Sequence, residues 1–193
     1  SLVNKSKNGV WDGKDMTKYI TTPGFDEDKD INSGEAEGWT IDNQGGGNVT
    51  RGPLGQGNKD LMESTLDKMN YCFEAWHSSN FDVWQEVTDL PVGMYEVQVQ
   101  GYVRYLDGQD AIANRESIPA EIPIYVYMND SKTQFANWFD YPQEPGFYSQ
   151  FSGATYLTDA NEYEYPDNTP AAAAAFDKGD YTRSAFGLVA QRG

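Results

Sequence analysis

The sequence predicts an all-β domain, a β-sandwich with jelly-roll topology that carries one short alanine-rich helix near its C-terminus. Apolar and polar side chains alternate with a period of two over much of residues 93–105, as in a strand with one face in water. The Leu-Pro-x-Gly sequence at 90–93 favours a chain reversal, because proline presets φ and glycine accepts a positive φ. Several other short segments are typical of strands, whereas helical patterns are few.

The alternating segment assigns side chains to the two faces of its strand. We expect one parity to face the opposing sheet: Tyr95, Val97, Val99, Val103 and Tyr105. We expect the other parity to stay in contact with water: Glu96, Gln98 and Gln100. Arg104 also lies on the polar face, where we expect it to pair with an acidic residue.

The remaining strands are expected at residues 39–41, 69–75 and 122–128. Pro123 should make the first residues of the last strand irregular or place it at a sheet edge. The glycine-rich residues 43–60 are expected to form a long loop. Residues 137–168 mix aromatics, prolines and acids with little period, which predicts an elaborate surface excursion.

Helices are expected only at two places. Residues 15–20 predict a turn or two of helix, with Asp15 as the N-cap. The alanine-rich residues 171–175 predict the C-terminal helix, which Thr169 can cap, Pro170 can begin and Gly179 can end.

The composition favours one domain and excludes some partners. The 193 residues suit a lead-in segment over 1–14 and a single β-sandwich domain over 15–193. Lys plus Arg total 14 and Asp plus Glu total 30, so the net charge of −16 repels phosphate backbones and makes nucleic acid an unlikely partner. No stretch approaches the ~20 apolar residues of a membrane span.

Cysteine and aromatic content bear on compartment and function. A single cysteine, Cys72, cannot form an internal disulfide, which fits a cytosolic or a bacterial secreted protein. Aromatic residues make up 14% of the chain, so some are expected at the surface, where tyrosine and tryptophan are favoured contact residues.

Enzymatic motifs are incomplete in this chain. Residues 52–57 have the glycine spacing of a phosphate-binding loop, but Asn58 stands where that loop needs lysine. His77 is the only histidine, and neighbours in sequence cannot supply the spatial geometry of a triad. Paired acids such as Asp140 and Glu144 arise by chance among 30 acidic residues. We therefore expect no catalytic residue, and a glycoside hydrolase ranks third among the functions.

Three carboxylates at alternate positions form a candidate metal site: Asp26, Asp28 and Asp30. The EF-hand pattern fails, because Ile31 stands where it requires glycine. Oxygen-rich loops can bind calcium without that fold, so two interpretations stay open: a solvated acidic loop, which is favoured, and a structural calcium ion. No cofactor is required in either case.

The densest mixture of aromatic and polar side chains predicts the ligand site. Sugar rings pack a C–H face on aromatic planes, while their hydroxyls need directional polar partners. The candidate ligand-binding residues are Trp138, Asp140, Tyr141, Glu144 and Tyr148. In the competing and favoured interpretation, Trp138, Phe139 and Phe147 form a small satellite core at one end of the sandwich.

An ordered set of short motifs runs through almost the whole chain. They are Asp15-Met-Thr, Pro23-Gly-Phe, Gly38-Trp, Glu74-Ala-Trp, Phe81-Asp-x-Trp-Gln, Leu90-Pro-x-Gly-x-Tyr, Gly101-Tyr-Val-Arg and Phe176-x-x-Gly-x-Tyr. Together they resemble the galactose-binding-like jelly-roll modules of secreted and surface proteins from glycan-degrading gut bacteria. The matching residues belong mostly to turns and core, so the resemblance transfers a fold and no ligand site.

The resemblance implies a non-catalytic module, extracellular or at the cell surface, that recognises carbohydrate or mediates adhesion. A neutral glycan is the expected ligand, and the alternative is a structural spacer or protein-interaction module without a sugar site. Similar modules continue beyond the strand at 183–191 into a further strand pair. We therefore expect an exposed sheet edge that another domain of the same polypeptide or a second chain can cover.

Overall fold

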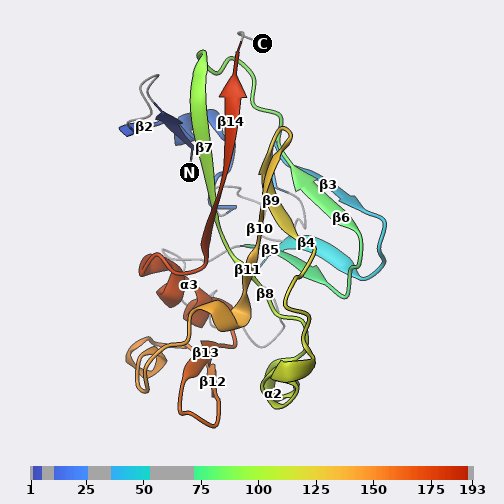
Figure 1. Cartoon of the computed structure of the whole chain (residues 1–193), viewed down its shortest axis with the longest axis vertical. Coiled ribbons are helices and arrows are strands. Elements are labelled where there is room, and N and C mark those ends of the chain that lie inside the picture. Colours follow the sequence, from blue (N-terminus) through green and yellow to red (C-terminus); the bar gives the residue numbers. More distant parts are fainter. Residues whose placement is uncertain (1, 6–10, 26–35, 53–71, 191–193) are drawn as a thin grey trace. The chain divides into compact units, whose positions relative to one another are not determined.

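The structure is a computed structural model that describes residues 2–5, 11–25, 36–52 and 72–190 (Figure 1). Two compact units divide the chain: unit 1 comprises residues 1–93 with 189–193, and unit 2 comprises residues 94–188. Strands dominate the described residues, and the two α-helices among them are short. The expected β-rich character is therefore confirmed, while the single domain over 15–193 stays a prediction.

Unit 1 consists of paired short strands and one turn of 3-10 helix. Strand β1 (Leu2–Lys5) pairs with β2 (Trp11–Asp15), β3 (Thr40–Asn43) with β6 (Phe81–Trp84), and β4 (Asn48–Gly52) with β5 (Cys72–Trp76), all antiparallel. The 3-10 turn η1 (Thr17–Tyr19) follows β2, and the Asp15 carboxylate accepts a hydrogen bond from the Thr17 backbone N–H at 2.8 Å. The expected helical turn is thus present in its shortest form, but its N-cap is Met16 and not Asp15, which lies one residue earlier.

The long loop expected over residues 43–60 is wrong for its described part, because β4 lies within it. Glycines at 45–47 shorten the connection after β3 to a tight turn, so the chain enters β4 at Asn48. Val49 is 7% exposed, and the burial of this side chain stabilises a strand that its glycine-rich surroundings did not predict.

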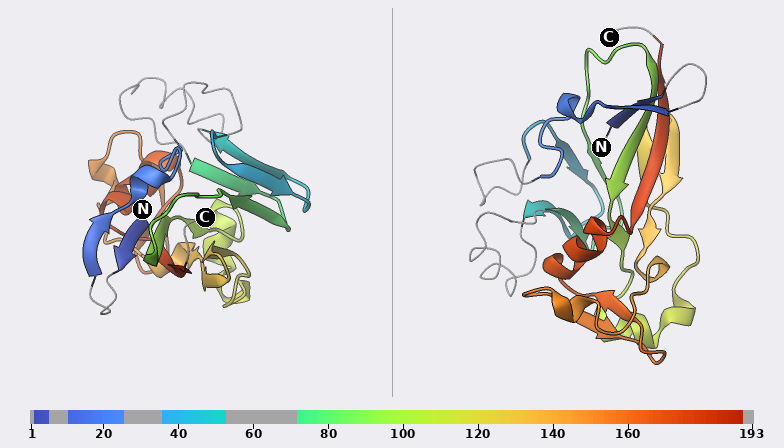
Figure 2. Two further views of the ribbon diagram at one scale, coloured as in Figure 1. Left: turned by 90° about the horizontal axis from the view of Figure 1, so that it is seen from above. Right: turned by 90° about the vertical axis from the view of Figure 1, so that its left-hand side faces the viewer.

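Unit 2 contains the remaining strands (Figure 2). Strand β7 (Gly93–Gln100) lies beside β14 (Thr182–Val189), β9 (Tyr125–Met128) pairs with β10 (Ser131–Gln134), β8 (Tyr102–Val103) runs parallel to β11 (Ala136–Asn137), and β12 (Tyr156–Thr158) pairs with β13 (Glu164–Pro166). In the strand order, β14 has β7 as its only neighbour among the described residues, so it is an edge strand.

The helices of unit 2 are α2 (Gly108–Ala113) and α3 (Thr169–Asp177), with 3-10 turns η3 (Arg115–Ser117), η4 (Trp138–Asp140) and η5 (Tyr148–Gln150). Helix α3 was expected, but its N-cap is Asn168 and not Thr169: the Asn168 side chain accepts a hydrogen bond from the Ala171 backbone N–H at 3.0 Å. Gly179 follows the helix with φ of +90°, as a terminating glycine should. Helix α2 was missed because six residues are too few to show a helical period.

The face assignment of the alternating segment is confirmed only at its ends before Gly101, where Tyr95 is buried and Gln100 is exposed. The residues between them, 96–99, are all half-buried, so the expected contrast between the two faces is absent there. Tyr95 is fully buried, whereas Tyr105, expected in the core, is 55% exposed. The ladder breaks at Gly101, where the Phe135 ring lies 2.7 Å from the position of a Cβ and the backbone N–H donates to the Tyr181 carbonyl. After this break the parity changes, and Tyr102 packs against the core instead.

The Arg104 prediction is confirmed, because its guanidinium donates to the Asp167 carboxylate at 2.7 Å. This contact links the start of the segment after β8 to the segment before α3.

The region at 137–168, expected as a surface excursion, supplies much of the core of unit 2. One cluster of buried residues comprises Ala136, Tyr148, Ala171, Ala174, Ala175 and Tyr181, and a second comprises Ala111, Trp138 and Tyr165. Alanines on α3 leave room for these rings to approach the helix, which lies beside β13 (Figure 2). Aromatic rings bury large areas without strand periodicity, so the sequence pattern did not reveal this core.

Replacing either of two buried tyrosines of this core by phenylalanine should affect the free energy of unfolding differently. The Tyr181 hydroxyl donates to the Trp138 carbonyl at 2.9 Å, whereas the buried Tyr148 hydroxyl has no hydrogen-bond partner in the described part of the chain. Tyr181→Phe should therefore lower the free energy of unfolding by about 1 to 2 kcal/mol, and Tyr148→Phe should leave it unchanged or raise it by about 1 kcal/mol. Urea unfolding of both variants measures this, and equal losses would contradict the assignment.

Candidate functional site

Trp138 is not a ligand-binding residue, which corrects the sequence prediction. Its side chain is fully buried, and its indole N–H donates to the Pro166 carbonyl at 2.8 Å. The Phe139 and Tyr165 rings each lie 5.0 Å from the indole, centroid to centroid. No ring face is left for a sugar, and the satellite-core interpretation describes Trp138 correctly.

Tyr148 is equally buried, so its predicted role in ligand binding is also wrong. Its ring stacks on Tyr156 at 5.9 Å and meets Phe147 edge-on at 4.9 Å. Burial raises the pKa of the Tyr148 hydroxyl well above its usual value. Phe147 itself is half-buried and packs against the same cluster.

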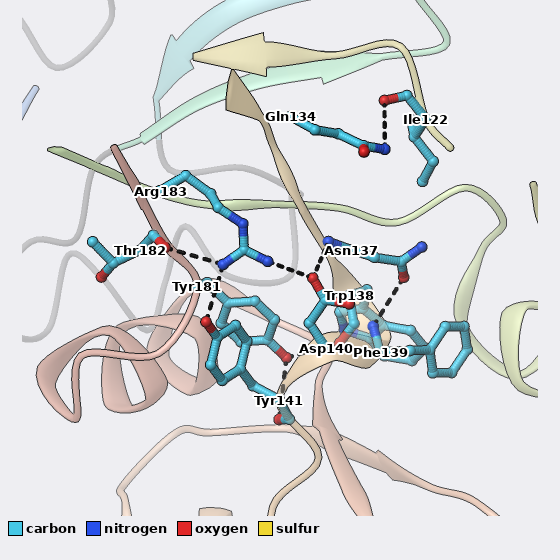
Figure 3. Close-up of polar contacts among 10 residues, drawn as sticks. All are labelled: Ile122, Gln134, Asn137, Trp138, Phe139, Asp140, Tyr141, Tyr181, Thr182 and Arg183. Atoms are coloured by element: carbon cyan, nitrogen blue, oxygen red, sulfur yellow. Dashed lines mark hydrogen bonds and ion pairs between the residues drawn. The ribbon is translucent and has the colours of Figure 1, made fainter. Parts of the chain in front are cut away.

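Asp140 and Tyr141 are partly exposed, but they bind Arg183 (Figure 3). The Arg183 guanidinium donates to Asp140 Oδ2 at 2.6 Å and to the Tyr141 hydroxyl at 3.0 Å. Asp140 Oδ2 also accepts from the Asn137 backbone N–H at 3.0 Å, which completes the cap of η4. These groups join η4 to β14 and satisfy one another. Glu144 is exposed, as a ligand-binding residue would be. Because Trp138 and Tyr148 are buried, the five predicted residues do not share one accessible surface.

A groove lies instead beside the buried Trp138 cluster, with a volume of about 500 Å³. Three segments of unit 2 line it: residues 112–117 at the end of α2 and in η3, Phe139 of η4, and residues 159–161 in the β12–β13 turn. Volumes of this order are typical of small-molecule sites. Of its lining residues, only Phe139 lies within 138–148, the stretch that holds the predicted ligand-binding residues.

Arg115 is the one cation among the lining residues of the groove. Its guanidinium carbon lies 4.4 Å from the centroid of the Phe139 ring, an arrangement favoured by the charge distribution of the ring. Its Nη1 atom donates to the Tyr165 hydroxyl at 3.4 Å and lies 3.7 Å from Asp159 Oδ2. The side chain is nevertheless 49% exposed, so further donor N–H groups can reach a ligand.

Asp159 holds the β12–β13 turn, which is another lining segment of the groove. Its Oδ1 atom accepts hydrogen bonds from the backbone N–H groups of Asn161 at 2.9 Å and Tyr163 at 3.1 Å, and its Oδ2 atom accepts from the Tyr165 hydroxyl at 3.2 Å. Burial raises the pKa of Tyr165, and Asp159 adds to this increase. The turn is thereby held rigid, with Ala160 and Asn161 at the rim of the groove.

The groove combines hydrogen-bonding groups with small apolar surfaces. Asn114, Asn161 and Ser117 supply amides and a hydroxyl, while Ile112, Ala113 and Ala160 supply the apolar part. Its charged lining residues are one cation, Arg115, and two acids, Glu116 and Asp159. Without a net positive charge, the lining is better suited to a neutral polar ligand than to an anion.

The described residues offer no cluster of metal ligands, and their one thiol is a poor nucleophile. No group of three or more His, Cys, Asp or Glu residues there is placed to hold a metal ion. Asp26, Asp28 and Asp30 lie outside the described residues, so the calcium site stays a prediction. Burial raises the pKa of the Cys72 thiol to about 12, so this thiol stays protonated near neutral pH.

Comparison of the chain with protein-family models, with curated proteins and with solved structures found no match. Among the helices that the structure describes, none has the length and apolar character needed to cross a membrane.

The Asp140–Arg183 contact predicts a structural role that a double-mutant cycle can measure. The two side chains are 40% and 23% exposed, so solvent screening should limit their coupling free energy to about 0.5 to 1 kcal/mol. Asp140→Ala should cost somewhat more, because the cap of η4 is also lost. Glu144→Ala, on the same surface segment, is the control and should change stability by less than about 0.5 kcal/mol. Zero coupling would show that the pair does not hold η4 on β14.

Proposed function

We propose that this chain is a non-catalytic carbohydrate-recognition or adhesion module of a secreted or cell-surface protein, built as a jelly-roll β-sandwich, and that unit 2 binds a neutral glycan in the Arg115 groove. The observation that carries the proposal is the lining of this groove, in which directional donors and acceptors surround small apolar surfaces and no net positive charge is present. Sugars offer these same two features, hydroxyl groups and C–H faces.

The rigidity of the groove supports recognition of a ligand as weakly hydrophobic as a sugar. Arg115 is held by Phe139, Tyr165 and Asp159 before any ligand arrives. A side chain that is already ordered loses less conformational entropy on binding, and that saving matters when little apolar area is buried. We expect affinities in the micromolar to millimolar range, about −8 to −4 kcal/mol.

Charge favours neutral over anionic glycans. The whole chain carries a formal charge of −16, and the acids of the groove outnumber its cation. Both terms repel uronates and sulfated sugars at low ionic strength.

The hydrogen bonds already made by the carboxylate of Asp159 favour sugar binding without hydrolysis. A glycosidase needs two carboxyl groups about 5 to 10 Å apart, one to donate a proton and one to act on carbon or water. Asp159 is occupied on both oxygens by backbone and phenol donors, so it serves as a structural acceptor. Glu116 is then the only other acid among the lining residues.

Blocking the groove tests the proposal. A glycan array first identifies the neutral oligosaccharide that binds most strongly, and calorimetric titration then compares variants with it. Ala160→Trp fills the rim and should weaken binding at least about tenfold, or about 1.4 kcal/mol. Asn161→Ala, which removes one amide, should weaken it less.

The matched control is Ala120→Trp, which places the same side chain at an exposed position outside the groove. It should bind like the unmodified protein. Equal affinities for Ala160→Trp and Ala120→Trp would refute the groove as the sugar site.

An interaction or spacer module is the second candidate, and the edge strand β14 favours it. Phe186 and Leu188 occupy alternate positions of this strand and are 41% and 59% exposed. Apolar side chains on an exposed strand are typical of contact with another domain or chain.

Light scattering tests this candidate through concentration-dependent association of the chain. Association that Leu188→Gln abolishes would favour the interaction module. The control must be an exposed apolar residue, which excludes Leu106 because it packs on the core. Val92→Gln, at a position that is 53% exposed, serves instead. A monomer at all concentrations would remove the support for self-association.

A further inference from the structure

Trp76 is an exposed tryptophan at the end of β5 in unit 1, and the groove in unit 2 leaves it unexplained. Half of its surface is accessible to water. Tryptophan is highly buried on average, because its indole has a large apolar area. Among the unit 1 residues whose burial the structure describes, 14–25, 36–49 and 72–93, Val92 is the only other large hydrophobic side chain exposed to a comparable degree.

The backbone around Trp76 leaves no room for side chains. A Cβ at Gly47 would lie 2.1 Å from the Trp76 carbonyl oxygen, and a Cβ at Gly45 would lie 2.0 Å from the Asn80 backbone nitrogen. Glycine is therefore required at both positions, and the 45–47 turn packs directly on the segment after β5. This close packing fixes the chain where it leaves β5 directly after Trp76.

A network of uncharged polar groups lies in the same two loops. The Ser78 hydroxyl donates to Asn43 Oδ1 at 2.7 Å, and the Gly45 backbone N–H donates to the same atom at 3.3 Å. The Ser79 hydroxyl donates to the Gly45 carbonyl at 3.2 Å. The Asn43 amide also donates to the Gly47 carbonyl at 3.4 Å. Because these donors are used inside the network, what it offers a sugar hydroxyl is mainly the acceptor lone pairs of the serine hydroxyls.

His77 orients the indole. Its backbone has φ of +52°, a conformation that costs energy for a residue other than glycine. Its imidazole meets the Trp76 ring edge-on, with 4.1 Å between centroids and 70° between planes. An edge contact of this kind stabilises the ring without covering both of its faces.

We propose that Trp76 is a stacking platform for a neutral saccharide, a second site in unit 1 that shares no residue with the groove. The indole supplies the flat surface for the C–H face of a sugar ring, and hydrogen bonds would come from the polar network of Asn43, Ser78 and Ser79 in the adjoining segments. A protein partner would need a wider apolar patch than one aromatic ring among polar loops. The site does not depend on the proposed function of unit 2.

Indole NMR signals test the platform directly. The protein is labelled with 15N-tryptophan, and the Trp76 Nε1–H signal is assigned from its loss in Trp76→Phe. Neutral tetrasaccharides of glucose, mannose, xylose and galactose are then titrated. The Trp76 signal should shift saturably with at least one of them, and Trp76→Ala should weaken that binding about tenfold or more.

Stability separates the platform from a structural role. Because Trp76 is half exposed, Trp76→Ala should change the melting temperature little, and Trp76→Phe should keep part of the affinity through its smaller ring. Met94→Ala, at another partly exposed apolar position, is the control and should bind like the unmodified protein. A Trp76 signal that none of the four sugars moves would overturn the inference.

The two sites fail independently in this experiment. A sugar that binds with no Trp76 shift, and whose affinity falls in Ala160→Trp, would overturn the platform and keep the groove. A Trp76 shift that persists in Ala160→Trp would support the proposed platform. An unchanged total affinity in the same variant would contradict the proposed groove site.

Discussion

The need to pair polar groups on buried aromatic side chains organises the core of unit 2. Trp138 and Tyr181 have no exposed surface, yet each carries an N–H or O–H that must find an acceptor. The indole donates to Pro166 in β13, and the phenol donates to the Trp138 carbonyl in η4. These two bonds join three segments that are far apart in sequence. Because each ring is also packed against other rings, a shift of any one segment would break both packing and hydrogen bonds.

The groove is a consequence of this core. Once Trp138 is anchored, the next residue, Phe139, lies against both Trp138 and Tyr165, and it supports the Arg115 guanidinium. Tyr165 in turn binds Asp159, which holds the turn that forms the other wall. The site is therefore built on rigid packing, and its exposed groups are few. In unit 1 the segments next to Trp76 are held by backbone packing and not by packed rings, because the chain at Gly45 and Gly47 lies against the segment that follows β5.

Sequence patterns identified the elements that have a clear period or a strong local signal. The strand at β7 and the alanine-rich helix α3 both follow from such signals. The turn expected at 90–93 does not form as predicted, because Gly93 lacks the positive φ that was to close it. The pattern failed after Gly101, where the strand is interrupted and the Phe135 ring leaves no room for a Cβ: Tyr105, expected in the core, is exposed, and Tyr102 packs on the core instead. It also placed the N-cap of α3 one residue late, because Asn168 and Thr169 are both good capping residues and only the backbone geometry distinguishes them.

The sequence by itself determined that this is an acidic, β-rich chain with an excess of aromatic residues, a single histidine and a single cysteine, which cannot form a disulfide within the given chain. Only the tertiary structure decided which aromatics are core and which are accessible: Trp138 and Tyr148 are buried, while Trp76 is exposed. The physical reason is that burial of a ring depends on neighbours supplied by distant segments, and an irregular stretch of sequence carries no periodicity that would reveal them. For the same reason, the gathering of Arg115, Phe139 and Asp159 around one groove could not be read from their positions along the chain.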